Sequence, residues 1–212
     1  MRPFGRTIEK ADVLTFAAMM VASYLVGSIP FGVLVGRARG FDPRAVGSGN
    51  IGMTNVARAG GRGAAILTFA GDILKGAIPV VVARSLGLTA PELAWVALAA
   101  FVGSICSVFL GFKGGKGVSA ALGIWVVLSP LALLFALAVF GVVLAAFRIM
   151  SLASIAAALV IPAAVAAVSA PHPFVLLAVA MSALVLLRHR ENISRLLKGE
   201  EPKFIGRDAR RA

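Results

Sequence analysis

Long apolar runs constrain the fold of this chain more than any other feature. Runs at 13–36, 64–83, 93–111 and 149–170 are each close to the length of about 20 apolar residues that a transmembrane helix needs. Hydrophobic residues make up 59% of the chain and charged residues only 14%, unlike the composition of soluble globular domains. Because a backbone in lipid must satisfy its hydrogen bonds internally, these runs predict an all-α, polytopic integral membrane protein.

Two further apolar stretches are less regular. The first, 119–147, is too long for one comfortable crossing and contains Ser129-Pro130, where proline would end or kink a helix. A turn there yields two crossings, although the half 119–129, at about 11 residues, also fits a tilted or re-entrant piece. The second stretch, 170–187, is slightly short for a span.

The polar segments of the chain suggest how many times it crosses. If the loops at 37–62 and 112–118 and the tail from Arg188 build one site, an even number of crossings separates each pair. Counting 119–147 as two crossings meets this condition. It predicts about seven transmembrane helices with the polar motifs clustered on one side. Five arginines in the loop 37–62 and the basic tail identify that side as cytoplasmic by the positive-inside rule. Because the net charge of +12 is confined to loops and tail, we expect no nucleic-acid partner.

The first polar loop combines glycines, hydroxyls, amides and an arginine. These groups suit a phosphorylated or polyhydroxyl small molecule; the candidate ligands are Ser48, Gly49, Asn50, Thr54, Asn55 and Arg58. The same loop formally contains a GxGxxG match, which we reject as a dinucleotide site because its flanks are membrane spans rather than a βαβ unit. A glycine-rich loop that only caps helix ends is the structural alternative.

Asp72 and Lys75 are charged residues inside an apolar run. Their i, i+3 spacing places both on the same side of a helix. Each costs about 2.5–3.5 kcal/mol at the membrane centre, so we expect them to pair, to face inward or to lie near the boundary. A structural ion pair and a substrate contact both remain open.

A basic glycine loop, 111–117, lies between two apolar runs. Glycine lets backbone N–H groups close on an anion and lysine supplies charge, so we predict a phosphate nest in which Lys113 and Lys116 act with the N–H groups of Gly114, Gly115 and Gly117. The loop departs from a Walker A motif, since Leu110 and Gly117 occupy two of its defining positions. A positively charged turn without a ligand is the structural alternative.

The last apolar run is followed by a polar segment. His189, Asn192 and Arg195 recur every three residues, so on a helix they lie along one face. A juxtamembrane basic helix that binds anionic lipid would explain the arginines but leave the histidine and asparagine unexplained.

Together these motifs resemble one family. The segments are Tyr24 to Pro30, Gly47 to Arg58, Asp72 to Gly76, Phe112 to Gly117, and Arg188 to Glu201. They are similar to those of the bacterial acyl-phosphate:glycerol-3-phosphate acyltransferases, over about residues 20–204. The resemblance departs at Ser104, where many relatives carry histidine, and at Ser119-Ala120, where many carry Ala-Thr.

The resemblance implies a seven-helix membrane fold and a specific reaction. Members transfer a fatty acyl group from acyl phosphate to the 1-hydroxyl of glycerol 3-phosphate, giving lysophosphatidate and phosphate at the cytoplasmic side of the cell membrane. Acyl phosphate, glycerol 3-phosphate and membrane lipids are the partners, with no cofactor and no metal. We expect catalytic roles for Ser48, Lys116, His189 and Asn192. We expect substrate binding by Gly49, Asn50, Thr54, Asn55, Arg58, Asp72, Lys75, Lys113, Gly114, Gly115 and Glu201.

The reaction needs little from the protein beyond orientation and charge. An acyl phosphate is already activated, so two anions must be aligned and a carbonyl oxyanion stabilised. We hypothesise that a substrate phosphate accepts the hydroxyl proton while His189 or Ser48 assists alignment. Neither histidine begins the HxxxxD spacing of acyl-CoA-dependent acyltransferases. We expect a single transmembrane domain over 1–212, with an extension at 1–12 and a basic tail at 205–212; the rival function is a transporter or channel for a phosphorylated anion.

Overall fold

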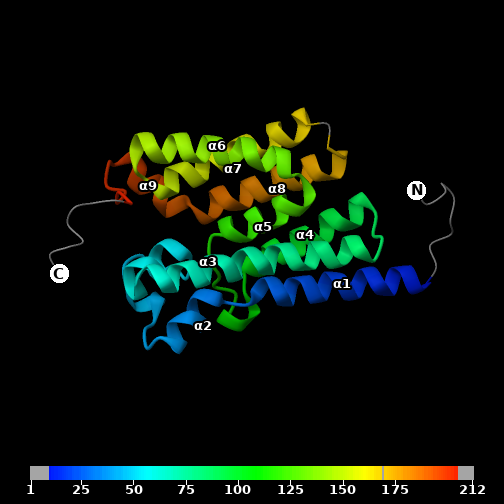
Figure 1. The fold of residues 1–212 in the computed structure, drawn as a ribbon, viewed down its shortest axis with the longest axis horizontal. Helices are drawn as coiled ribbons and strands as arrows, with labels where there is room; N and C mark the ends of the chain where they lie inside the picture. Colours follow the sequence, from blue (N-terminus) through cyan, green and yellow to red (C-terminus); the bar gives the residue numbers. More distant parts are fainter. Residues whose placement is uncertain (1–9, 169, 205–212) are drawn as a thin grey trace.

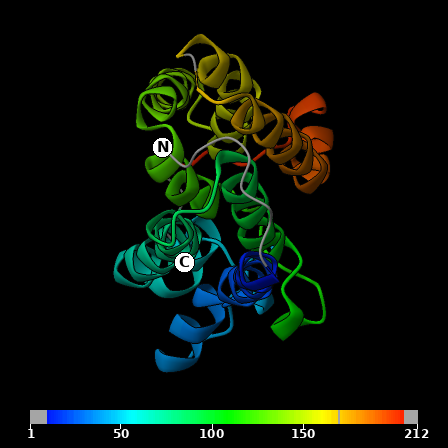
Figure 2. The same cartoon turned by 90° about the vertical axis from the view of Figure 1, so that its right-hand side faces the viewer.

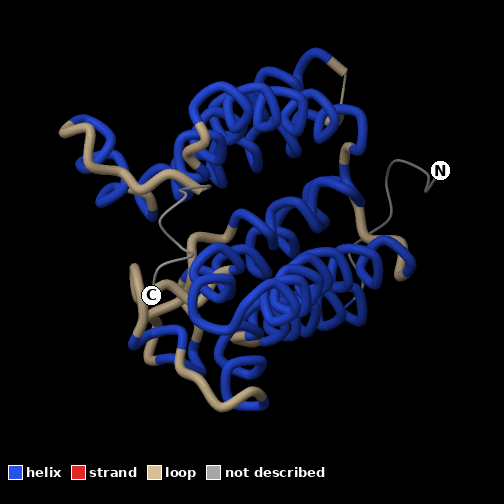
Figure 3. Tube along the Cα trace, turned by 60° about the vertical axis from the view of Figure 1, so that its left-hand side comes forward, coloured by secondary structure: helices blue, strands red, loops and turns tan. Residues whose placement is uncertain are grey.

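The computed structural model describes residues 10–168 and 170–204, so most of the predicted extension (1–9) and the predicted tail (205–212) lie outside the described residues. Those residues form helices and connecting loops without strands (Figure 3). The helices are α1 Lys10–Ser28, α2 Phe31–Ala38, α3 Met53–Ser85, α4 Ala90–Ile105, α5 Val118–Leu128, α6 Pro130–Phe147, α7 Met150–Ala167, α8 His172–Arg188 and α9 Arg190–Leu197, with short 3-10 turns at Pro43–Ala45 and Val108–Leu110. The all-α prediction is confirmed.

The lengths of these helices support the predicted set of spans. Within the described residues, four helices are long and apolar enough to cross a membrane alone: α3, α4 with its following turn, α6 and α7. The pair α1 and α2, bent by 42°, and the pair α8 and α9, bent by 61°, each qualify when taken together. The shorter apolar helix α5 brings the set to about seven. The helix boundary at Ser129-Pro130 is where the sequence predicts it, since α5 ends at Leu128 and α6 begins at Pro130.

The helices form two adjoining groups whose axes run roughly along one direction. In the first group α1 packs on α4 and α3 packs on α5, while in the second α7 packs on α6 and α8 (Figures 1 and 2). The start of α3 and the helix α9 lie at the left end of Figure 1, and α1 begins at the opposite end. The first polar loop and the polar segment after α8 therefore share one end of the molecule, as the parity argument predicts.

Two breaks in the first group have identifiable causes. Pro30 lies between α1 and α2 and cannot donate a backbone hydrogen bond. At this break the carbonyl of Ile29 accepts hydrogen bonds from the N–H of Phe31 at 3.2 Å and from Lys75 Nζ at 3.0 Å. In α3, Gly61 has φ +77° and ψ −178°, a conformation that only glycine adopts readily. It separates the short first part of α3 from the membrane-crossing part, which matches the predicted run at 64–83.

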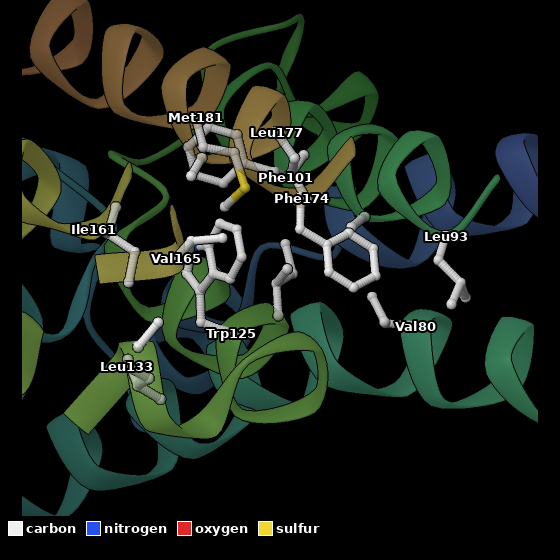
Figure 4. Packing of buried hydrophobic residues seen from close by; sticks show 14 of the residues in the cluster. Val80, Leu93, Phe101, Trp125, Leu133, Ile161, Val165, Phe174, Leu177 and Met181 are labelled. Carbon is white, nitrogen blue, oxygen red and sulfur yellow. The ribbon is translucent and has the colours of Figure 1, made fainter. Parts of the chain in front are cut away.

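The hydrophobic core lies between the two helix groups. Phe101 of α4, Trp125 of α5, Val165 of α7 and Met181 of α8 are at most 3% exposed and belong to one buried cluster (Figure 4). Residues of α3 and α6 complete it. This packing holds the second half of the bundle against the first, and it ends where the cavity described next begins.

Candidate functional site

A cavity of about 800 Å³ lies between the two helix groups. One part, the polar head, is lined by the loop before α3, the first turns of α3, the loop before α5 and the segment after α8. Its polar side chains are Ser48, Asn50, Thr54, Arg58, Lys116, His189, Asn192, Arg195 and Glu201. The other part, the apolar limb, is lined by α5, α6, α7 and α8 through residues such as Leu122, Ala136, Phe140, Ala157 and Val185. The cavity thus joins a polar chamber to an apolar channel.

The loop between α2 and α3 is held by the side chain of Asn55. Its Nδ2 lies 2.7, 2.9 and 2.9 Å from the carbonyl oxygens of Pro43, Val46 and Asn50, and its Oδ1 accepts from the N–H of Ser48 at 3.0 Å. Asn55 is only 2% exposed. Because backbone groups occupy its amide, the structure leaves it no free donor for a ligand and places it as the support of the loop.

Other polar groups of this loop are open toward the cavity. Within the described residues, the Ser48 hydroxyl, the Asn50 Nδ2 and the Arg58 guanidinium have no hydrogen-bond partner. Gly52 precedes α3 without a side-chain cap. Gly52, Met53 and Thr54 all line the cavity, so the N-terminus of this long helix borders the polar head. Helix N-termini attract anions. Gly49, by contrast, is not part of the cavity lining.

The glycine loop contributes differently from the predicted nest. The N–H groups of Gly114 and Gly115 donate to the carbonyls of Ile105 and Ser104 at 3.2 and 3.0 Å. The prediction of a phosphate nest is therefore wrong for these two groups, because they are already bonded. Arg188 holds the loop from the other side by donating to the carbonyls of Gly114 and Gly115 at 2.8 and 3.1 Å.

The two lysines of the glycine loop lie in different places. Lys113 is exposed and outside the cavity lining, whereas Lys116 lies in the polar head. Gly117, with φ +78°, turns the chain into α5, and a side chain there would collide with the ring of Phe101. The glycines thus let the loop bend sharply, so that Lys116 and the N-terminus of α5 both reach the cavity.

A chain of hydrogen bonds joins Lys116 to the segment after α8. Lys116 Nζ donates to Asn192 Oδ1 at 2.5 Å, and Asn192 Nδ2 donates to Glu201 Oε1 at 2.5 Å. Glu201 also accepts from Ser151 Oγ at 2.7 Å and pairs with Arg195 Nε at 2.7 Å. The sequence predicts Lys116, Asn192 and Glu201 as site residues, and the structure brings all three into one network.

The environment of this network alters the protonation of its members. Burial lowers the pKa of Lys116, a shift that the Glu201 carboxylate partly opposes. Burial raises the pKa of Glu201, but the hydrogen bonds from Ser151, Asn192 and Arg195 outweigh it, so the net pKa is lowered. At neutral pH Glu201 is therefore ionised, and the pH at which Lys116 loses its proton is below that of an ordinary lysine.

His189 is a buried neutral base at the junction of α8 and α9. It is 2% exposed, and burial lowers its pKa to about 4, with the charge of Lys116 acting in the same direction. Its Nδ1 lies 2.8 Å from the carbonyl of Val185, which can only accept, so Nδ1 carries the proton and Nε2 carries a lone pair. His189 lines the polar head as a hydrogen-bond acceptor.

Asp72 and Lys75 form a buried ion pair at the edge of the cavity. Lys75 Nζ lies 2.7 Å from Asp72 Oδ1, with side-chain exposures of 5% and 14%. Since Lys75 also donates to the carbonyl of Ile29, the pair fastens α3 to the break between α1 and α2. Both residues line the cavity, so the expected pairing is present and a contact with substrate stays a prediction.

Several polar residues that line the cavity were not among the predicted catalytic and binding residues. Ser151 and Arg195 both bind Glu201, and Ser104 lines the cavity while its hydroxyl donates to the carbonyl of Phe101. The three-residue spacing had already placed Arg195 on one helix face with His189 and Asn192, and the structure brings it into the same network. The single hydroxyl of Ser151 at the start of an apolar helix carries no such signal.

The described residues contain no group of three or more histidine, cysteine, aspartate or glutamate side chains that could hold a metal ion. The head instead gathers cationic side chains, two helix N-termini and unpaired neutral donors. Such a set binds phosphate groups, and the adjoining apolar limb can take an aliphatic chain.

Comparison with known proteins points to one family. A model of the family described as glycerol-3-phosphate acyltransferase matches residues 17–199. The chain is 50% identical to the glycerol-3-phosphate acyltransferase of Geobacter sulfurreducens over 88% of its own length and 96% of the relative's, and 52% identical to that of Trichlorobacter lovleyi over 87% and 95%.

Solved structures give the same assignment. Crystal structures of the integral membrane glycerol 3-phosphate acyltransferase PlsY, in its glycerol 3-phosphate and lysophosphatidic acid forms, superpose with TM-scores of 0.86 and 0.84 at 40% and 39% identity. The first alignment covers 91% of this chain and 96% of PlsY, and the second covers 89% and 95%.

Proposed function

This chain belongs to the glycerol-3-phosphate acyltransferase family of integral membrane enzymes, and we propose that it transfers a fatty acyl group from acyl phosphate to the 1-hydroxyl of glycerol 3-phosphate. The products are 1-acylglycerol 3-phosphate and inorganic phosphate. One observation carries the proposal: the Lys116, Asn192 and Glu201 network stands at the head of an apolar limb. A phosphorylated, water-soluble acceptor and a lipid-like donor are the two substrates that such a cavity fits.

The polar head supplies charge and donors for two phosphate groups. We assign the donor's phosphate to the N-terminus of α3 with Ser48, Asn50 and Arg58, whose donors are unpaired. The acceptor's phosphate is assigned to Lys116 and Arg195, which lie on the other side of the head. Two anions brought into one chamber repel each other, so the cations must neutralise both before the reacting atoms can approach.

The acyl carbonyl lies where the head meets the limb. The glycerol hydroxyl oxygen attacks this carbon, the bond to the phosphate oxygen breaks, and the hydroxyl proton passes to the departing phosphate. Hydrogen-bond donors near the carbonyl oxygen stabilise the charge that develops on it, and the Ser48 hydroxyl and Lys116 are the candidates. No strong protein base is required, because phosphate is a good leaving group and itself accepts a proton.

His189 has a role that follows from its protonation state. With a pKa of about 4 it is too weak a base to hold the proton at neutral pH. Its Nε2 lone pair instead accepts a hydrogen bond from a glycerol hydroxyl and so directs an oxygen toward the carbonyl. This alignment contributes to the rate by positioning.

The polar head faces the cytoplasm in this proposal. The loops at that end carry most of the basic residues of the chain, including Arg37, Arg39 and Arg62, as the positive-inside rule requires of a cytoplasmic side. Glycerol 3-phosphate then enters from water, and the acyl donor enters from the adjoining membrane.

The deciding experiment mixes purified protein in lipid with palmitoyl phosphate and glycerol 3-phosphate, and measures phosphate and lysophosphatidate together. We expect both to form only when the acceptor is present, and palmitoyl-CoA to give no product. Lys116→Ala should lower kcat/KM by roughly 10²-fold or more, the cost of losing one preorganised charged donor. Activity only with acyl-CoA, near-normal turnover in Lys116→Ala, or uptake of glycerol 3-phosphate into proteoliposomes without product would overturn the proposal.

A further inference from the structure

The apolar limb of the cavity has a closed end. Each of its four helices runs either toward or away from the polar head. The order of the lining residues along a helix therefore shows which one lies farthest from the head. These residues are Trp125 on α5, Leu133 on α6, Ile161 on α7 and Met181 on α8, and we call them the floor. The floor residues are 3%, 8%, 6% and 2% exposed.

Beyond the floor the protein is solid. The next buried side chains are Ala164 and Val165 on α7 and Ala178, Leu177 and Phe174 on α8; they belong to the core cluster and do not line the cavity. Figure 4 shows Trp125 lying among Ile161, Val165 and Leu133. An acyl chain that enters from the polar head therefore meets packed side chains at the floor.

The walls above the floor are apolar in effect despite their hydroxyl groups. Ser154 Oγ donates to the carbonyl of Met150 at 2.9 Å, and Ser182 Oγ donates to the carbonyl of Ala158 at 2.5 Å. Because these hydroxyls already bond backbone carbonyls, a hydrocarbon chain can contact the wall without leaving them unpaired. One lining residue, Leu137, is 40% exposed, so the limb lies close to the surface of the helix bundle there.

The depth of the limb follows from helix geometry. At a rise of 1.5 Å per residue, Gly117 to Trp125 on α5 spans about 12 Å and Ser151 to Ile161 on α7 spans about 15 Å. An extended alkyl chain with C–C bonds of about 1.5 Å and angles of about 111° advances about 1.25 Å per carbon. A straight chain of about 10 to 12 carbons therefore fills the limb from head to floor.

We propose that the floor sets the acyl-chain length that this enzyme prefers, with Trp125 as its largest element; the inference rests on the proposed acyl transfer. A donor of about 12 carbons fits without rearrangement. A longer chain must displace a packed floor residue or bend out past Leu137 into the lipid. Overfilling a packed apolar space costs roughly 1–3 kcal/mol, or about 5- to 150-fold in relative rate.

A competition assay tests this inference. Dodecanoyl phosphate and hexadecanoyl phosphate are mixed in equal amounts with glycerol 3-phosphate, and the two lysophosphatidates are counted by mass spectrometry. The product ratio does not depend on how much enzyme is folded. We expect the wild-type protein to favour the 12-carbon donor, and Trp125→Ala to raise the share of the 16-carbon product at least about fivefold.

Matched variants keep the test decisive. Ala136→Leu narrows the limb one turn above the floor. In a mixture that also contains decanoyl phosphate, this variant should shift the product ratio toward the shorter donors. Its control is Ala138→Leu, the same change at an exposed position of α6, and the control for Trp125→Ala is Trp95→Ala, at the exposed second tryptophan on α4. Neither control residue lines the cavity, so both should keep the wild-type ratio. If Trp125→Ala does not fold, Trp125→Phe takes its place.

The outcomes separate this inference from the proposed function. Turnover with an unchanged product ratio in both floor-side variants would overturn the floor and leave the acyl transfer standing. A ratio that shifts equally in the exposed controls would also overturn it. Absence of lysophosphatidate from every donor in the wild-type protein would overturn the proposed function, and the inference with it.

Discussion

Two buried asparagines anchor two sides of the polar head, and they do so in different ways. Asn55 bonds only backbone groups of its own loop, at Pro43, Val46, Ser48 and Asn50. Asn192, 6% exposed, bonds only side chains, and both of its partners are ionisable. The same residue type therefore builds a scaffold in one region and an adjustable electrostatic network in the other.

The difference teaches how to divide a polar motif into supporting and reacting members. A side chain that makes all its hydrogen bonds to backbone groups fixes the geometry of a loop, and its loss lowers the stability of the fold. A side chain that links charged groups controls the positions of those charges, and its loss lowers the rate of the reaction. The substitutions below should separate these two behaviours.

The largest effect should come from Asn55→Ala. Three carbonyls and one N–H lose their partner, and buried unsatisfied groups cost about 1–3 kcal/mol each. We expect a large fall in the melting temperature in detergent and loss of activity with both substrates. A variant that melts normally would show that the loop does not depend on this amide.

A smaller effect on stability and a selective effect on turnover should come from Asn192→Ala. Lys116 and Glu201 lose the group that bridges them, so we expect kcat/KM for glycerol 3-phosphate to fall by roughly 10²-fold. The melting temperature should fall less than in Asn55→Ala. If Asn192→Ala lowered the melting temperature as much as Asn55→Ala and its folded fraction turned over normally, the two asparagines would have the same structural role.

The pH profile sharpens the comparison further. The lowered pKa of Lys116 predicts that activity falls as pH rises through a value below that of an ordinary lysine, because the neutral amine cannot neutralise phosphate. Since the Glu201 charge raises the pKa of Lys116, Glu201→Gln should move this fall to lower pH. Lys116→Arg should remove it. The measurement is kcat/KM against pH at fixed ionic strength, and an unshifted Glu201→Gln profile would contradict the coupling.

The smallest effect should come from Lys113→Ala. Its side chain is exposed and outside the cavity lining, so it acts only through long-range attraction of anionic substrates, which salt screens. We expect about a twofold rise in KM at low salt and almost none at physiological salt. A loss comparable with that of Lys116→Ala would restore Lys113 to the site that the sequence predicts.

Much of the fold could be read from the sequence because the membrane restricts the choices. Apolar runs had to be helices, and Ser129-Pro130 had to interrupt one of them; the structure has both. The bends after Ser28 and Arg188 were not predicted, because they depend on partners far along the chain, such as Lys75 bonding the carbonyl of Ile29.

The candidate site could be predicted from the sequence less completely than the fold. Residue types and spacing were sufficient to select Lys116, His189 and Asn192, because each carries unusual polarity beside an apolar run, whereas Glu201 was expected only from the family resemblance. Spacing could not reveal that the N–H groups of Gly114 and Gly115 bond carbonyls of the preceding segment. Nor could it reveal Ser151, which joins the network only through tertiary packing of α7 against the segment after α9.

The contacts of Glu201 also bear on how the enzyme is made. Glu201 follows all the apolar helices in the chain, yet it fixes Asn192, Arg195 and Ser151, and nearby Phe204 donates its N–H to the carbonyl of Arg148 at 2.6 Å. Because synthesis runs from the N-terminus, Glu201 is added to the chain after Ser151, Asn192 and Arg195. The charge network therefore cannot close until all the apolar helices have been made, and activity begins only when the segment after α9 has folded back onto α7 and α9.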